Sequence, residues 1–105
     1  MRDLDAYGRF LADDCAMRFN NEPPTAGKAA VLRRLRDYWQ SFRSIEHDLL
    51  SIYGEPRAFM LEALNHYVRL NNRPMTCRAV ALTDRNAESL VTAMRFYTDV
   101  SALFA

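Results

Sequence analysis

The order of helix-like and strand-like segments restricts the fold of this chain more than any other feature. From Ser44 onward, four segments rich in β-branched and aromatic residues follow one another, separated by turn signals. They read SIEHDLLSIY, AFMLEALNHYVRL, TCRAVALT and LVTAMRFYTD. Composition alone would also allow a helix for AFMLEALNHYVRL, but Asn71 and Asn72 followed by TCRAVALT favour a long hairpin. We therefore predict four consecutive antiparallel strands.

The first part of the chain predicts a helix and a short strand. Asp3 can cap a helix that continues through the segment RDLDAYGRFLADD. Its apolar residues at helical spacing are Leu4, Tyr7, Phe10 and Leu11. In the segment CAMRFN, Cys15, Met17 and Phe19 alternate with small or polar residues, which indicates a half-buried strand.

A second helix is predicted from about Ala26 to Arg43, with Thr25 as its N-cap, after a break at the two prolines of NEPPTAG. Its apolar stripe consists of Leu32, Leu35, Trp39 and Phe42. The arginines opposite this stripe indicate a solvated face or, alternatively, a contact with an anion. Helices first and strands afterwards favour an α+β domain, with the helices packed on one face of a curled antiparallel sheet.

Composition narrows the class of protein. A chain of 105 residues fits one domain, residues 1–105. Fourteen basic and 13 acidic residues give a net charge of +1, which does not favour nucleic-acid binding. Charged residues near the start argue against a signal peptide, and no apolar run reaches the length of a membrane helix. With only Cys15 and Cys77, far apart, we expect free thiols and a cytoplasmic location.

Several segments together resemble the SnoaL-like proteins of the nuclear-transport-factor-2-like (NTF2-like) superfamily. They are FLADDCAMRFNNEPPTAGKAAV, YWQSFRSIEHDLLSIYGEP, MLEALNHYVRLNN and AMRFYTDVSALF. The resemblance implies a cone-shaped α+β barrel of about four to five strands, a cavity inside the cone, and a homodimer. Relatives of this kind include ketosteroid isomerases, limonene-epoxide hydrolases, scytalone dehydratases and polyketide cyclases. A fold of this kind supplies a cavity, so the function depends on the residues that line it.

Three departures from the family pattern bear on function. The resemblance implies a further helix ahead of Asp3 that this sequence does not contain, which should leave apolar surface for a second subunit or a large ligand. The Asp-Arg-Asp set of the epoxide hydrolases is incomplete, because Asn65 and Ala63 stand near two of its positions. The isomerase base would fall at Phe19 or Asn20, and neither side chain can abstract a proton.

The last strand presents three polar residues at alternate positions. Arg95, Tyr97 and Asp99 share one face at intervals of about 6.6 Å, and we predict that this face lines the cavity. Burial there would raise the pKa of Asp99 and make it a usable acid or base. Tyr97 and His47 would then orient or polarise a substrate oxygen. Which face points inward depends on the register, and a slip of one residue would exchange the two faces.

The remaining candidates carry two interpretations each. His47 and His66 either bind a ligand or are hydrogen-bonded structural histidines. Trp39, Phe42, Phe19, Met17 and Tyr38 either form the apolar wall of the cavity or belong to the plain core. No ligand spacing indicates a metal, and the three glycines form no phosphate-binding loop, so no cofactor is predicted.

Two functions remain open. The first is a domain that binds a small apolar molecule or dimerises through the outer sheet face, with Met94 and Phe96 in the interface. The alternative is a small enzyme of isomerase, hydrolase, dehydratase or cyclase type, in which Asp99 transfers a proton on an apolar oxygenated substrate. The missing catalytic sets favour the first.

Overall fold

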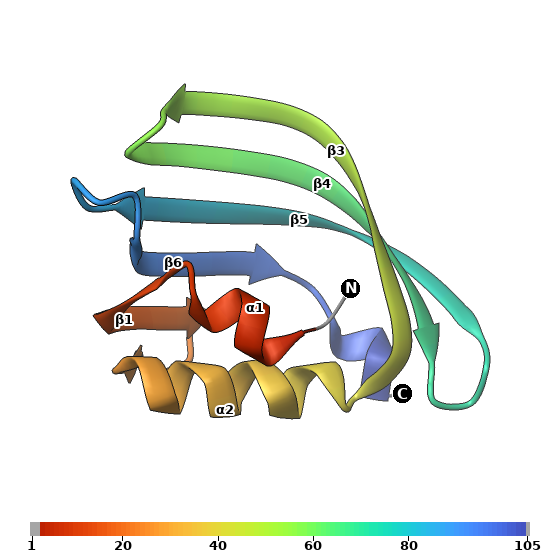
Figure 1. Ribbon diagram of the computed structural model, residues 1–105. Helices are drawn as coiled ribbons and strands as arrows, with labels where there is room; N and C mark the ends of the chain where they lie inside the picture. Colours follow the sequence, from red (N-terminus) through yellow and green to blue (C-terminus); the bar gives the residue numbers. More distant parts are fainter. Residues whose placement is uncertain (1–2, 105) are drawn as a thin grey trace.

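Two α-helices lie against one face of a single curved sheet in the computed structural model, which describes residues 3–104 (Figure 1). In chain order the elements are α1 (Leu4–Gly8), β1 (Leu11–Phe19), β2 (Thr25–Ala26), α2 (Lys28–Trp39), β3 (Phe42–Glu55), β4 (Ala58–Arg69), β5 (Pro74–Arg85), β6 (Val91–Thr98) and the 3-10 helix η1 (Ser101–Phe104). No helix formed by these residues has the length and apolar character needed to cross a membrane.

The sheet has six strands in the order β2-β1-β6-β5-β4-β3. The prediction of consecutive antiparallel strands is confirmed for β3 to β6, and AFMLEALNHYVRL is the strand β4. The predicted fold class, helices packed on a curled sheet, is confirmed, and the sheet differs from the prediction in two details. It has six strands instead of four to five, because the short β2 adds an edge, and β1 pairs with β6 in parallel. Turn signals report on neighbours in sequence, and β1 and β6 are separated by most of the chain.

Helix α1 is shorter than predicted. The carboxylate of Asp3 caps it as expected, since Oδ1 accepts hydrogen bonds from the backbone N–H groups of Asp5 and Ala6 at 3.0 and 3.2 Å. The helix ends at Gly8, however, and Leu11 opens strand β1 opposite Val91. Phe10 lies beyond the helix and is 65% exposed, so it does not belong to the apolar face of α1 that its spacing indicated.

Helix α2 begins later and ends earlier than predicted. Gly27 is its N-cap, at a φ of 89° that favours glycine, and Thr25 lies in β2 instead. Phe42 already belongs to β3, so the apolar stripe of the helix continues into the following strand. Val31 and Leu35 are the buried residues of α2.

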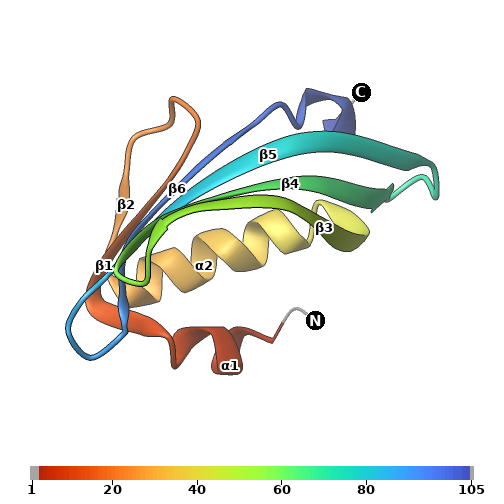
Figure 2. The same ribbon diagram turned by 90° about the horizontal axis from the view of Figure 1, so that it is seen from above.

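The core lies on the concave face of the sheet. One cluster joins β1, α2 and β6 and comprises Leu11, Cys15, Met17, Phe19, Val31, Leu35 and Met94. A smaller cluster comprises Phe42, Tyr67 and Leu103. Both α-helices lie on the concave side, whereas the opposite, convex face carries no α-helix among residues 3–104 (Figure 2). Toward their hairpin, β3 and β4 extend away from α2, and Leu49 and Ile52 are exposed there (Figure 1).

Candidate functional site

A pocket of about 510 Å³ lies between α2 and the concave face of the sheet, within the usual range for small-molecule sites. Most of its wall is apolar and aromatic, and a few polar groups interrupt it. The lining residues are Tyr7, Phe19, Leu35, Tyr38, Trp39, Ser44, Ile45, His47, Asn65, Ala79, Phe96 and Thr98. The lining of this pocket can be compared with the predicted residues, and its use as a ligand cavity stays a prediction.

The side of strand β6 that faces the pocket is the one opposite to Arg95 and Tyr97. Phe96 and Thr98 line the pocket, and Met94 is only 4% exposed in the core. The ring of Phe96 stacks on that of Phe19, with centroids 4.9 Å apart. The parallel register sets this orientation, because it pairs Phe96 with Phe19 and Met94 with Met17.

Arg95 and Tyr97 consequently point to the convex face, and the prediction that they line the cavity is wrong. Tyr97 is 40% exposed, and its hydroxyl accepts a hydrogen bond from Arg18 at 3.3 Å. The prediction that Met94 and Phe96 lie in a dimer interface is also wrong, because Met94 belongs to the core and Phe96 packs against it. The homodimer itself stays a prediction.

Asp99 lies beyond the end of β6 and does not line the pocket. Its Oδ1 accepts hydrogen bonds from the Ser101 hydroxyl at 2.7 Å and from the Ser101 backbone N–H at 3.1 Å. These bonds lower the pKa of Asp99 below its ordinary value, because they stabilise the carboxylate. The predicted rise of this pKa is therefore wrong, and the carboxylate serves the start of η1.

His47 is the predicted catalytic residue that does line the pocket. It pairs in register with Asn65 on β4, and His47 Nδ1 lies 2.6 Å from Asn65 Oδ1. The amide nitrogen of Asn65 points to the hydroxyl of Tyr67, 3.5 Å away. This orientation makes Asn65 Oδ1 the acceptor and His47 Nδ1 the donor, so that Nε2 of the neutral ring is left to accept a proton.

Asn65 anchors this cluster from inside the protein. It is 6% exposed and is the buried polar residue of the described chain. Tyr67, next on the same face of β4, is 1% exposed, and its hydroxyl shares a hydrogen bond with that of Tyr38 from α2. Four side chains from β3, β4 and α2 thus form one connected polar cluster: His47, Asn65, Tyr67 and Tyr38.

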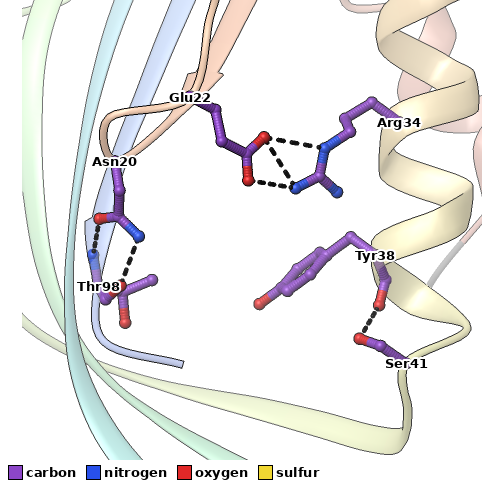
Figure 3. Close-up of polar contacts among 6 residues, drawn as sticks. All are labelled: Asn20, Glu22, Arg34, Tyr38, Ser41 and Thr98. Carbon is purple, nitrogen blue, oxygen red and sulfur yellow. Dashed lines mark hydrogen bonds and ion pairs between the residues drawn. The ribbon is translucent and has the colours of Figure 1, made fainter. Parts of the chain in front are cut away.

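Both tyrosines of the cluster stay protonated well into alkaline conditions. Burial, followed by the hydrogen bond to Tyr67, raises the pKa of Tyr38 above its ordinary value. Burial likewise raises the pKa of Tyr67. Figure 3 shows the ring of Tyr38 reaching from α2 toward the sheet. Of the cluster, Tyr38 with its neutral hydroxyl, the imidazole of His47 and the amide of Asn65 therefore line the pocket.

The edge of the pocket is held by two contacts of the segment that follows β1 (Figure 3). Asn20 exchanges two hydrogen bonds with the backbone of Thr98, at 2.8 and 2.9 Å. Glu22 pairs with Arg34 of α2 at 3.0 Å, and the guanidinium of Arg34 lies 4.5 Å above the Phe19 ring. These contacts fix the walls formed by Phe19 and Thr98.

The other predicted binding residues divide between wall and core. Trp39 and Phe19 line the pocket, whereas Met17 and Phe42 are 1% and 3% exposed and belong to the core clusters. His66 faces the convex side and does not line the pocket, so the prediction that it binds a ligand there is wrong. It contacts Asp48 at 2.7 Å and Thr76 at 2.9 Å.

The sequence interpretation gave no site role to Asn65, Tyr67, Phe96 and Thr98. The sequence held a usable signal for two of them. Asn65 and Tyr67 are polar residues at alternate positions of β4, on the side of the strand whose preceding residues are apolar. Within residues 3–104, no group of three or more histidine, cysteine or acidic side chains is placed to hold a metal ion.

Comparison with known proteins identifies the fold. Neither a scan against protein-family models nor a search of curated proteins gave a match. Among solved structures, an NTF2-like protein of unknown function from Burkholderia pseudomallei K96243 has a TM-score of 0.84 at 13% identity, covering 98% of this chain and 83% of the other. A candidate polyketide cyclase from Xanthomonas campestris pv. campestris has a TM-score of 0.81 at 22% identity, covering 95% and 81%.

TerC, crystallised with polyporic acid, is similar to the same degree, with a TM-score of 0.83 at 12% identity over 98% of this chain and 84% of TerC. At such identities the likeness shows the fold alone. This chain has the same fold as these SnoaL-like and NTF2-like proteins, and the resemblance drawn from its sequence is confirmed at the level of the fold.

Proposed function

We propose that this protein binds a small, largely apolar molecule bearing at least one oxygen in the pocket between α2 and the sheet. The carrying observation is the buried amide of Asn65, which contacts the His47 ring at the wall of a mostly apolar pocket. A buried polar group destabilises the fold unless it is hydrogen-bonded, and the Oδ1 atom of Asn65 is paired with the His47 ring. The free Nε2 atom is then the hydrogen-bond acceptor for a ligand hydroxyl.

The fold comparisons support this proposal without naming the ligand. A protein with the same fold was crystallised with a small molecule, polyporic acid. Fold alone does not transfer a ligand, so the proposal rests on the side chains of this pocket. Its aromatic wall, formed in part by Phe19, Trp39 and Phe96, suits a flat apolar body.

Paired probes with and without an oxygen test the proposal. Naphthol should bind about fivefold more tightly than naphthalene, because one hydrogen bond in an apolar pocket contributes roughly 1 kcal/mol. His47→Leu should remove this difference while retaining the affinity for naphthalene. The matched control is His66→Leu, since His66 is the other histidine of the chain and faces the convex side. Equal binding of both probes by the unaltered protein would overturn the proposal.

A second candidate function is proton transfer at His47. The observation that favours it is the 2.6 Å contact between His47 Nδ1 and Asn65 Oδ1, which leaves Nε2 of this pocket-lining residue as the ring nitrogen that can accept a proton. In that role, Nε2 takes a proton from the carbon next to a ketone. The electron pair of the C–H bond forms a carbon–carbon double bond, and the π pair of the carbonyl moves to its oxygen to give an enolate. Deuterium exchange into cyclohexanone in heavy water, compared between the unaltered protein and His47→Leu, measures this step. Equal exchange rates would contradict it.

A further inference from the structure

A single row of side chains crosses five strands on the convex face. Register pairs join Tyr53 to Met60, Met60 to Leu82, Leu82 to Arg95, and Arg95 to Arg18. Directly paired residues project to the same side of a sheet. The row therefore begins with one aromatic and two aliphatic side chains and ends with two guanidinium groups.

The apolar part of this row borders a hollow of about 320 Å³. Its lining includes Tyr53, Met60 and Leu82 and reaches Asp84 and Arg95 at one end. Tyr53 is 61% exposed, and both α-helices of the described chain lie on the other side of the sheet (Figure 2). This apolar hollow ends at Arg95 and Asp84, and Arg18 is the register partner of Arg95 on the next strand. Such a surface is suited to a molecule with an apolar part and an anionic part.

The charged end of the row is incompletely paired. Arg18 and Arg95 stand opposite each other, and like charges in this arrangement destabilise a sheet. The Nε atoms of both are buried without a hydrogen-bond partner. Arg18 Nη2 donates to the neutral hydroxyl of Tyr97, and Arg95 Nη2 is 3.8 Å from Asp84 Oδ2, beyond hydrogen-bond distance. Two cations and one anion leave a local charge of +1.

We propose that this row is a second binding site, separate from the pocket, for a small carboxylate with an apolar tail. One carboxylate matches the local charge of +1, and its two oxygens match the planar fork of a guanidinium. The tail would lie along Leu82, Met60 and Tyr53. Turning the guanidiniums toward the ligand would also pair the Nε groups that are unpaired now.

Methionine methyl signals in NMR spectra locate such a ligand, because the methionines are distributed between the two faces. Met60 lies in the row, whereas Met17 and Met94 are in the core behind the concave face. Octanoate should shift the Met60 signal in a saturable way, and acetate and octanol should do so only at much higher concentrations. A shift of Met94 without Met60, or no saturable shift, would overturn the proposal. A Met60 shift that follows protein concentration without octanoate would assign the row to a second copy of the chain.

Substitutions at the charged end then test the chemistry. Arg95→Gln and Arg18→Gln should each weaken octanoate binding about tenfold. Asp84→Asn should strengthen it several-fold, because it removes the carboxylate that opposes the ligand. Arg78→Gln is the matched control, since Arg78 is exposed on the same face but lies outside the row. A loss in Arg78→Gln equal to that in Arg95→Gln, or no gain in Asp84→Asn, would contradict a specific site.

Discussion

The two faces of the sheet use the same residue types for opposite purposes. On the concave face, His47 contacts the buried Asn65 and borders an aromatic pocket. On the convex face, His66 contacts Asp48 and Thr76 at the surface, and no α-helix of the described chain covers it. The comparison teaches that in this fold the chemistry of a side chain depends on which face its strand position selects.

The largest expected effect comes from neighbouring residues on opposite faces of β6. Phe96→Ala should lower the free energy of unfolding by roughly 3 kcal/mol, because it removes a ring packed on Phe19 and the core. Tyr97→Ala, one position along, should cost about 0.5 kcal/mol, since its ring is exposed. Urea unfolding curves of the two variants measure the difference. Similar losses in both would contradict the assignment of the faces.

A second pair compares the partners of the two histidines. Asn65→Ala should cost about 1–3 kcal/mol, because it removes a buried amide and leaves a void beside Tyr67. Thr76→Ala removes the partner of His66 at the surface and should cost less than about 0.5 kcal/mol. Thermal unfolding of both variants gives these values. A larger loss in Thr76→Ala would reverse the comparison.

Alkaline pH tests the tyrosine pair of the concave face. The pKa of Tyr38 is raised in the folded state, so its contribution to stability is complete below the ordinary value of 10.0 and is lost as the pH rises above it. The loss is at most about 1.4 kcal/mol per pH unit for this one group. Tyr38→Phe should make the stability curve flatter above pH 10.0. A stability curve that is as steep above pH 10.0 in Tyr38→Phe as in the unaltered protein would contradict the role of burial.

The smallest effect is expected at Asp99. Its pKa is lowered in the folded state, so it stabilises the fold above the ordinary value of 3.8 and loses this contribution as the pH falls through the lower folded value. Asp99→Asn should reduce the acid sensitivity of thermal unfolding slightly and should leave naphthol binding unaltered. Loss of naphthol binding in Asp99→Asn would return this residue to the site.

Much of the fold could be predicted because it depends on local patterns. The turn signals after β3, β4 and β5 identify four sequential strands, and the cap at Asp3 is a property of neighbouring residues. The parallel pairing of β1 with β6 could not be predicted in this way, since no local pattern joins segments so far apart. That pairing also decides which face of β6 is buried, and so the predicted site at Arg95, Tyr97 and Asp99 was placed on the wrong side.

The candidate site was only partly predictable for a related reason. His47 was identified because histidine is rare in this chain and bears chemistry. Its partner Asn65 is 18 residues away in sequence, and only the register of β3 with β4 brings the two together. The link to α2 through Tyr38 and Tyr67 depends on tertiary packing.

The most direct test of a ligand site on the concave face is to record the NMR signals of both histidine rings while naphthol is added. The account predicts that the ring nitrogen and hydrogen signals of His47 shift and saturate, and that those of His66 stay in place. It also predicts that the unliganded neutral His47 ring carries its proton on Nδ1, as the contact with Asn65 requires. Shifts at His66 with His47 unchanged, or a His47 proton on Nε2, would contradict a ligand site on the concave face.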